Sequence, residues 1–71
     1  MGAVMARGTV IFFDPEKGFG FIRPDDGSVE VLAHYSDIYG GGYRSLEKGQ
    51  KVDYELVQGA EGLKAVDIRP V

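Results

Sequence analysis

The sequence contains no cysteine and a single histidine among its 71 residues. Without cysteine the chain can form no disulfide and offers no thiolate to a metal, and one histidine has no second imidazole with which to hold zinc. No apolar run approaches the roughly 20 residues that span a bilayer, and residues 1–6 are too short for a signal peptide. We therefore expect no membrane association, and these absences fit the cytoplasm.

Positive charge is also scarce, since 8 Lys and Arg residues stand against 11 Asp and Glu residues, giving a net charge of −3. A partner bound mainly through phosphates needs clustered cations, because its affinity comes from released counterions. If the ligand is a nucleic acid, base stacking must supply most of the affinity. A chain this short forms one domain that buries only about 60% of its unfolded surface, so we expect the functional site on the surface.

The stretch KGFGFI at residues 17–22 predicts a β-strand with an unusual face. Strand side chains alternate between two faces, which places a cation and two rings, Lys17, Phe19 and Phe21, on the same side. The glycines on the other side allow the tight curl of a small barrel. Two interpretations remain open: an exposed platform on which each stacked base contributes about 1–3 kcal/mol, or an edge strand whose rings belong to the core.

Four further strands are predicted, over residues 7–13, 29–35, 50–57 and 63–69. Asp14-Pro15 ends the first, and Asp26-Gly27 is a strong hairpin signal between the second and the third. The long segment 36–49 is expected to contain one helical turn near Ile38 and an apolar anchor at Leu46. Three strands in a meander and two in a pair favour a small all-β closed barrel over a sandwich. Residues 1–6 are expected to form a flexible tail.

Alternation also predicts the faces of these strands. Val10 and Phe12 should share one face of the first strand, opposite Ile11 and Phe13. In the third strand the expected core set is Val29, Val31, Ala33 and Tyr35, and the expected exposed set is Glu30, Leu32 and His34. Pairing through the hairpin would place Leu32 and His34 beside Phe19 and Phe21, with His34 as a ring next to Phe21. In the fifth strand, Val66 and Ile68 are expected to point inward.

From about Arg7 to Ile68 the chain resembles the bacterial cold-shock proteins. Residues 17–22 reproduce the first ribonucleoprotein motif of that family, and VLAHY at residues 31–35 stands in the place of the second, usually V-F-V-H-F. Other matching positions at the family's spacing are Gly8-x-Val10, Asp26-Gly27, Ser36-x-Ile38, Gly42-Tyr43-x-x-Leu46 and Gly49-Gln50-x-Val52. The resemblance implies a cold-shock domain over residues 7–71, folded as a five-stranded antiparallel OB-fold barrel.

The resemblance also implies a function, which is the binding of single-stranded RNA or DNA with a leaning toward pyrimidines. Such a protein acts as an RNA chaperone or as a regulator of transcription or translation, including in cold adaptation. Carried over position by position, the residues that would stack on bases are Phe12, Phe19, Phe21, His34, Tyr35 and Tyr43. Lys17 and Arg44 would contact phosphates, and Glu30 would accept from a base edge. No enzyme activity, catalytic residue, metal, cofactor or small-molecule substrate is expected.

The chain departs from the family at several positions. Leu32 stands where a Phe normally stacks, and Ile11 stands where Lys is usual. The other departures are Phe12 for Trp, Asp14 for Asn, Ala33 for Val, Glu61 in a corner that is often basic or neutral, and Leu63 for Pro. Loss of one ring and one cation predicts binding that is about one to two orders of magnitude weaker than that of a typical member.

One alternative function belongs to a different class. Leu32 and Ile11 make the surface more apolar than stacking requires, and such patches also mark protein interfaces. The same barrel could therefore be a protein-interaction module. We expect a monomer, with a strand-swapped dimer through the glycine run 40–42 as the alternative.

Overall fold

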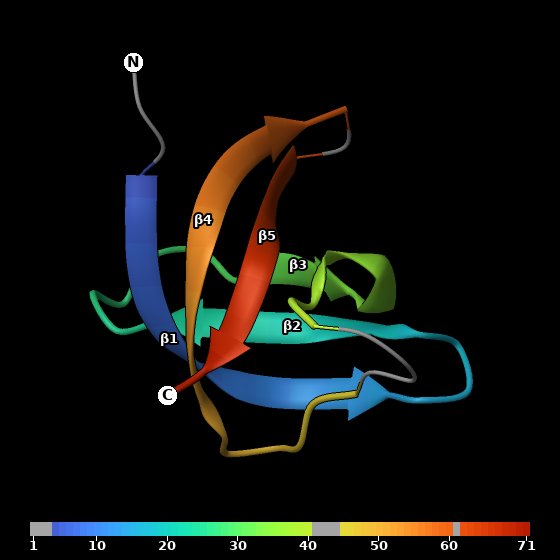
Figure 1. The fold of residues 1–71 in the computed structure, drawn as a ribbon. Coiled ribbons are helices and arrows are strands. Elements are labelled where there is room, and N and C mark those ends of the chain that lie inside the picture. The colour runs from blue at the N-terminus through green and yellow to red at the C-terminus, as the bar shows by residue number, and fades with distance from the viewer. Residues whose placement is uncertain (1–3, 41–44, 61) are drawn as a thin grey trace.

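The computed structural model describes residues 4–40, 45–60 and 62–71. Five strands close into a barrel in the order β1-β2-β3-β5-β4 (Figure 1). The elements are β1 (Val4–Asp14), β2 (Phe19–Pro24), β3 (Val31–His34), the 3₁₀ turn η1 (Tyr35–Asp37), β4 (Lys51–Gly59) and β5 (Gly62–Pro70). The predicted all-β barrel, with its meander of three strands and its separate pair, is confirmed. Within the described ranges no helix is long and apolar enough to cross a membrane.

The long strand β1 serves two neighbours. Its first half pairs with β4 from Val4 opposite Leu56, and its second half pairs with β2 down to Asp14 opposite Phe19. Figure 1 shows the bend between the two halves. Gly8 belongs to both pairings, and a Cβ there would lie 2.5 Å from the carbonyl oxygen of Arg23, so only glycine permits this close approach.

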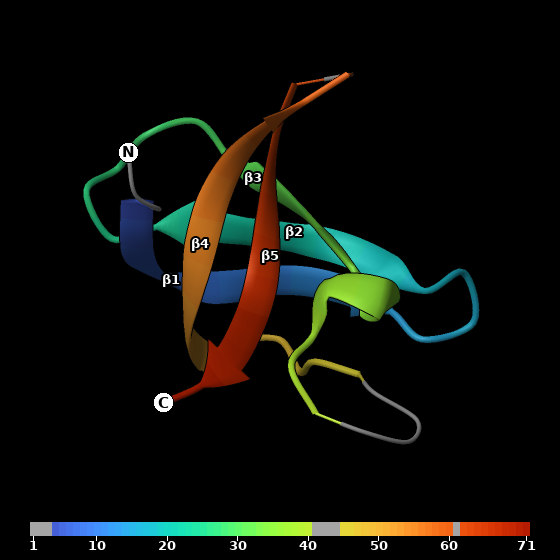
Figure 2. The ribbon, with the colours of Figure 1, turned by 45° about the horizontal axis from the view of Figure 1, so that its top comes forward.

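One pairing departs from the expected antiparallel pattern. β3 and β5 run parallel, with Leu32 opposite Lys64 and Ala33 opposite Ala65, whereas the other four pairings are antiparallel. Parallel neighbours need a long connection, and here the connection is the segment after β3 together with the whole of β4. The seam is short because β3 has only four residues. Figure 2 shows β4 and β5 crossing over the β1–β2 layer.

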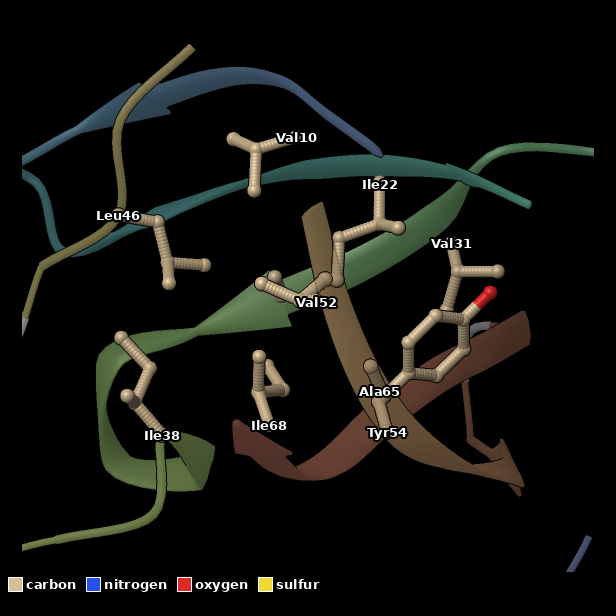
Figure 3. Packing of buried hydrophobic residues seen from close by; sticks show 10 residues of the cluster. Val10, Ile22, Val31, Ile38, Leu46, Val52, Tyr54, Ala65 and Ile68 are labelled. Atoms are coloured by element: carbon tan, nitrogen blue, oxygen red, sulfur yellow. The ribbon is translucent and has the colours of Figure 1, made fainter. Parts of the chain in front are cut away.

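Apolar side chains fill the barrel interior and come from every strand (Figure 3). Leu46 is buried beside Ile38 at one end, which confirms its predicted role as an anchor for the long connection. The buried set is Val10, Ile22, Val31, Ala33, Ile38, Leu46, Val52, Tyr54, Ala65 and Ile68.

A β-bulge overturns the predicted faces of β1. Val10 pairs with Ile22, but Phe12 pairs with the next residue back, Phe21, so Ile11 is an extra residue in the strand. Val10 therefore points into the core, while Phe12 on the far side of the bulge is 44% exposed. The prediction that these two side chains share a face is wrong, because simple alternation does not survive an inserted residue.

A second bulge corrects the prediction for β5. Asp53 of β4 pairs with Arg69, and Glu55 pairs with Val66, so three steps on β5 match two on β4. Asp67, inside this bulge, has a φ of 51°. The buried residues are therefore Ala65 and Ile68, three apart, and Val66 is only half-buried. Ile68 points inward as predicted, but Val66 does not.

The strand ends also differ from the predictions. β1 begins at Val4, so residues 4–6, expected as part of a tail, pair with β4, while residues 1–3 of that tail lie outside the described residues. β3 is shorter than expected, since Val29 is 75% exposed in the connection after Gly27 and Tyr35 is 49% exposed in η1. Both were predicted to be core. The turn itself is confirmed, with Gly27 at a φ of 81° and its amide donating to the carbonyl of Pro24.

Candidate nucleic-acid interface

Three phenylalanine rings meet on the outside of the barrel, over β1 and β2. Phe12, Phe19 and Phe21 form this phenylalanine cluster, with ring centroids 6.2–6.5 Å apart. Phe12 and Phe21 are inclined by only 22°, and Phe19 stands at 85° to both. Edge-to-face and offset arrangements of this kind are the favourable ones for aromatic rings. The rings lie outside the buried core, and the predicted alternation of β2 is confirmed by its burial pattern.

Gly20 and the β1 bulge bring these rings together. A Cβ at Gly20 would lie 2.6 Å from the Cα of Phe13, so the absent side chain lets β1 press against β2. The bulge at Ile11 then turns Phe12 outward beside Phe21. The sequence shows the glycine, but the bulge that aims Phe12 at the same face follows only from the pairing of the two strands.

A second pair of rings, His34 and Tyr35, extends this face at the end of β3. His34 lies opposite Phe19 in the strand register, and its ring centroid is 4.6 Å from that of Tyr35. The Ser36 amide donates to His34 Nδ1 at 3.2 Å, and Ser36 Oγ lies 2.8 Å from the same nitrogen. Nδ1 therefore acts as an acceptor, and a neutral ring carries its proton on Nε2. The Tyr35 ring lies against Gly18, where a Cβ would come within 2.6 Å of it.

Leu32 continues the face on the other side of Phe21. The two are opposite in register, which confirms that Leu32 and His34 lie beside the phenylalanines of β2, but His34 is opposite Phe19 and not Phe21. Leu32 and Phe21 also line a groove whose far wall comes from the β4–β5 end, including Leu63 and Lys64. Sequence reasoning did not assign Lys64 to this surface, because the β3–β5 seam that places it beside Leu32 has no local sequence signal.

Among the described residues, the charged ones predicted to contact nucleic acid do not form a cluster as the rings do. Lys17 is exposed but lies in the turn before β2, so the prediction that it continues the strand face of Phe19 is wrong. The turn holds Lys17 through its amide, which donates to Asp14 Oδ1 at 3.2 Å, and Gly18 follows at a φ of 81°. An amide bonded to a turn carboxylate cannot join a β ladder.

Glu30 is not a free acceptor, because Arg23 Nη2 lies 3.7 Å from its carboxylate. Both side chains are exposed, so this pair can open at small cost. Lys64 is also in an ion pair, since its Nζ lies 3.4 Å from Asp37 Oδ2. Tyr43 and Arg44, the remaining candidates, lie outside the described residues. Among the residues that the structure describes, no group of three His, Asp or Glu side chains could hold a metal ion.

Comparison with known proteins finds one family model, described as the 'Cold-shock' DNA-binding domain, which matches residues 6–71. A "Probable cold shock protein A" of Mycolicibacterium smegmatis is 49% identical over 94% of this chain and 100% of its own length. The "Cold shock protein ScoF" of Streptomyces coelicolor is 52% identical over 93% of this chain and 98% of its own length.

A solved structure described as drosophila Unr CSD456 superposes with a TM-score of 0.80. The match covers 99% of this chain but only 28% of that chain, at 21% identity. At this identity the likeness shows the fold alone.

Proposed function

Because the chain belongs to the cold-shock domain family, we propose that it binds single-stranded RNA or DNA by stacking bases on the outer face of β1, β2 and β3. The observation that carries the proposal is the phenylalanine cluster, three rings in mutual contact that the barrel leaves outside its core. Folding normally buries such rings. Rings that a glycine and a bulge hold outside the core support a role in binding.

The arrangement of the rings suits a flexible strand with unpaired bases. Phe12 and Phe21 are nearly parallel, so successive bases can lie on them without changing plane. His34 and Tyr35 supply a further stacking position at the end of β3, and Tyr43 is proposed to add another. Each stacked base contributes about 1–3 kcal/mol, and stacking tolerates every base because every base has a π-face. Base preference is accordingly weak and leans toward pyrimidines.

Few cations support this surface, and we propose Lys17 and Arg44 as its phosphate contacts. With one or two such contacts, the logarithm of affinity should fall against the logarithm of salt concentration with a slope of roughly −1 to −2. Glu30 would accept from a base edge once its pairing with Arg23 opens. Leu32 lies where it can contact a base but cannot stack as a ring does, so we expect weaker binding than in relatives that have an aromatic residue there.

Trapping unpaired bases would let the protein melt weak RNA structure, which is the action of an RNA chaperone. By the same binding it would regulate transcription or translation, including in cold adaptation. We propose that it works in the cytoplasm, as a monomer, and without catalysis.

Fluorescence anisotropy tests the proposal with labelled oligo-dT and oligo-rU of about seven nucleotides, a duplex control and two salt concentrations. Saturable binding of single strands over duplex, with the shallow salt slope given above, is the expected result. No binding up to about 100 µM would overturn the proposal. Low-nanomolar affinity at roughly 0.1 M salt would overturn the expected weakening by Leu32 and Ile11.

A protein-interaction module is the second candidate function, and the groove beside Leu32 favours it. Val29 and Leu63, which are 75% and 38% exposed, line this groove and extend the apolar surface beyond the rings. Salt separates the two functions, because apolar docking should be insensitive to salt or strengthen with it.

A further inference from the structure

A second cavity opens between the first half of β1, the β2–β3 connection, β4 and the start of β5. Its volume is about 330 Å³, at the lower end of the range of about 300–1,000 Å³ that holds small molecules. None of the residues proposed above to contact nucleic acid lines it within the described part of the chain. Its apolar walls come from Met5, Ala6, Val29, Val31, Leu56 and Leu63.

Tyr54, on β4, contributes the unusual group of this cavity. Its side chain is 0% exposed, and its hydroxyl has no hydrogen-bond partner among the described residues. Figure 3 shows the hydroxyl beside Val31, at the opposite end of the core from Ile38 and Leu46. Val31 and Tyr54 both line the cavity, and the hydroxyl lies at its inner end, shielded from solvent, so a ligand reaches it only when side chains at the rim move. A buried hydroxyl without a partner costs free energy that a ligand could recover.

Two carboxylates stand at the cavity rim. Asp26 accepts from the amide and the hydroxyl of Ser28, both through Oδ1, which leaves Oδ2 for another donor. Asp25 is paired with Lys51 at 2.7 Å. Burial first, and then the charges of Asp26 and Asp25, raise the pKa of Tyr54, so both carboxylates are felt at the hydroxyl. Because Lys51 already neutralises Asp25, Asp26 is the rim carboxylate that is suited to hold a cation.

Arg7 also lines the cavity, but its positive charge does not cancel the negative charge of Asp26 at the rim. Arg7 is engaged with Asp53 of β4 by two hydrogen bonds, at 2.6 and 3.2 Å from the two carboxylate oxygens. Lys51 is likewise held by Asp25. Met5 and Val29, on the rim, are largely exposed and can turn aside to admit a ligand.

We propose that this cavity binds a small organic amine with an apolar body, a hydrogen-bonding group that reaches the Tyr54 hydroxyl, and an ammonium that Asp26 holds at the rim. The aliphatic walls exclude water from the body of the ligand, and the two polar ends fix its direction. A hydroxyl at the inner end can both donate to and accept from Tyr54. An arylalkylammonium with a phenol at its far end meets all three requirements.

Three related probes test the proposal by NMR titration of the whole chain with methyl labelling: tyramine, phenethylamine, which lacks the hydroxyl, and p-cresol, which lacks the ammonium. Tyramine should shift the methyl signals of Val31, Leu56 and Leu63 in a saturable way. Each truncated probe should bind about five- to tenfold more weakly, because each lacks one polar contact. Equal binding of all three probes, or binding that does not saturate, would overturn the proposal.

Matched variants identify the contacts. Tyr54→Phe keeps the ring and should lower tyramine affinity to that of phenethylamine, whose own affinity stays unchanged. Asp26→Asn should weaken both amines but not p-cresol. Phe21→Ala is the control, and tyramine binding lost in this variant would show stacking on the phenylalanine cluster and overturn the proposal. If Tyr54→Phe fails to fold, the three probes on the native chain still decide.

Discussion

Two regions of one small barrel use aromatic rings in opposite ways. On the outer face Phe12, Phe19 and Phe21 contact one another, carry no polar atom and stay partly in water. Inside, Tyr54 is fully enclosed and brings a hydroxyl into the core. The outer rings can be removed at little cost to packing, whereas the inner ring occupies space that every strand helps to enclose. Function and stability should therefore be separable by mutation.

The largest expected effect comes from emptying the inner region. Tyr54→Ala removes the largest fully buried side chain of the described residues and should lower the free energy of unfolding by about 3–5 kcal/mol. A domain of this size has little more stability than that, so we expect a largely unfolded chain. Urea denaturation followed by circular dichroism measures the change. A variant that unfolds within about 1 kcal/mol of the native chain would show that the interior repacks.

Removing an outer ring should have the converse effect. Phe21→Ala should cost at least about 1 kcal/mol of single-strand binding, and up to about 3 kcal/mol, because it removes a stacking surface from the middle of the face. Its unfolding free energy should change much less than that of Tyr54→Ala. Anisotropy titration and urea denaturation of the same preparation give both numbers. Loss of the β-sheet signal in this variant would mean that the ring is part of the core.

Adding an aromatic ring to the outer face should have the opposite effect on binding to removing one. Leu32→Phe places an aromatic side chain opposite Phe21 and should strengthen oligo-dT binding by about five- to tenfold, near the lower limit for one stacked base. Leu32→Ile is the matched control, since it keeps an aliphatic side chain of equal size. If Leu32→Phe instead weakens binding, the groove between Leu32 and Leu63 accepts something other than a base.

The smallest expected effect is that of low pH on stability. Acid should weaken the pairing of the first half of β1 with β4 and leave the outer rings unaffected. The hydrogen bond and charge of Arg7 hold the pKa of Asp53 below its usual value. The stability that this pairing adds is present above the ordinary pKa of an aspartate and is lost as the pH falls through the lowered one. Both side chains are exposed, so the loss should be small. Denaturation from pH 6 to pH 2 should show a flatter acid limb in Asp53→Asn than in the native chain.

Much of the candidate site was predictable because it depends on neighbours along the strand. The alternation in residues 19–22 put Phe19 and Phe21 on one face, and the Asp26-Gly27 turn placed Leu32 and His34 beside them. Lys17 was misplaced because an amide bond to Asp14 keeps it in the turn. Lys64 was missed because the parallel seam that brings it beside Leu32 joins residues distant in the sequence.

By itself the sequence determined the number of strands, the order of the meander, the shared face of Phe19 and Phe21 and the family, because all of these rest on local patterns and spacing. The tertiary structure decided what depends on strand meeting strand. The bulge at Ile11 moves Phe12 out of the face of Val10, and the bulge at Asp67 replaces Val66 by Ala65 in the core. Neither bulge is encoded by a single residue, since each arises where two strands of a closed barrel must match at different lengths. The hydroxyl of Tyr54, which has no hydrogen-bond partner among the described residues, is likewise buried only once the barrel has closed around it.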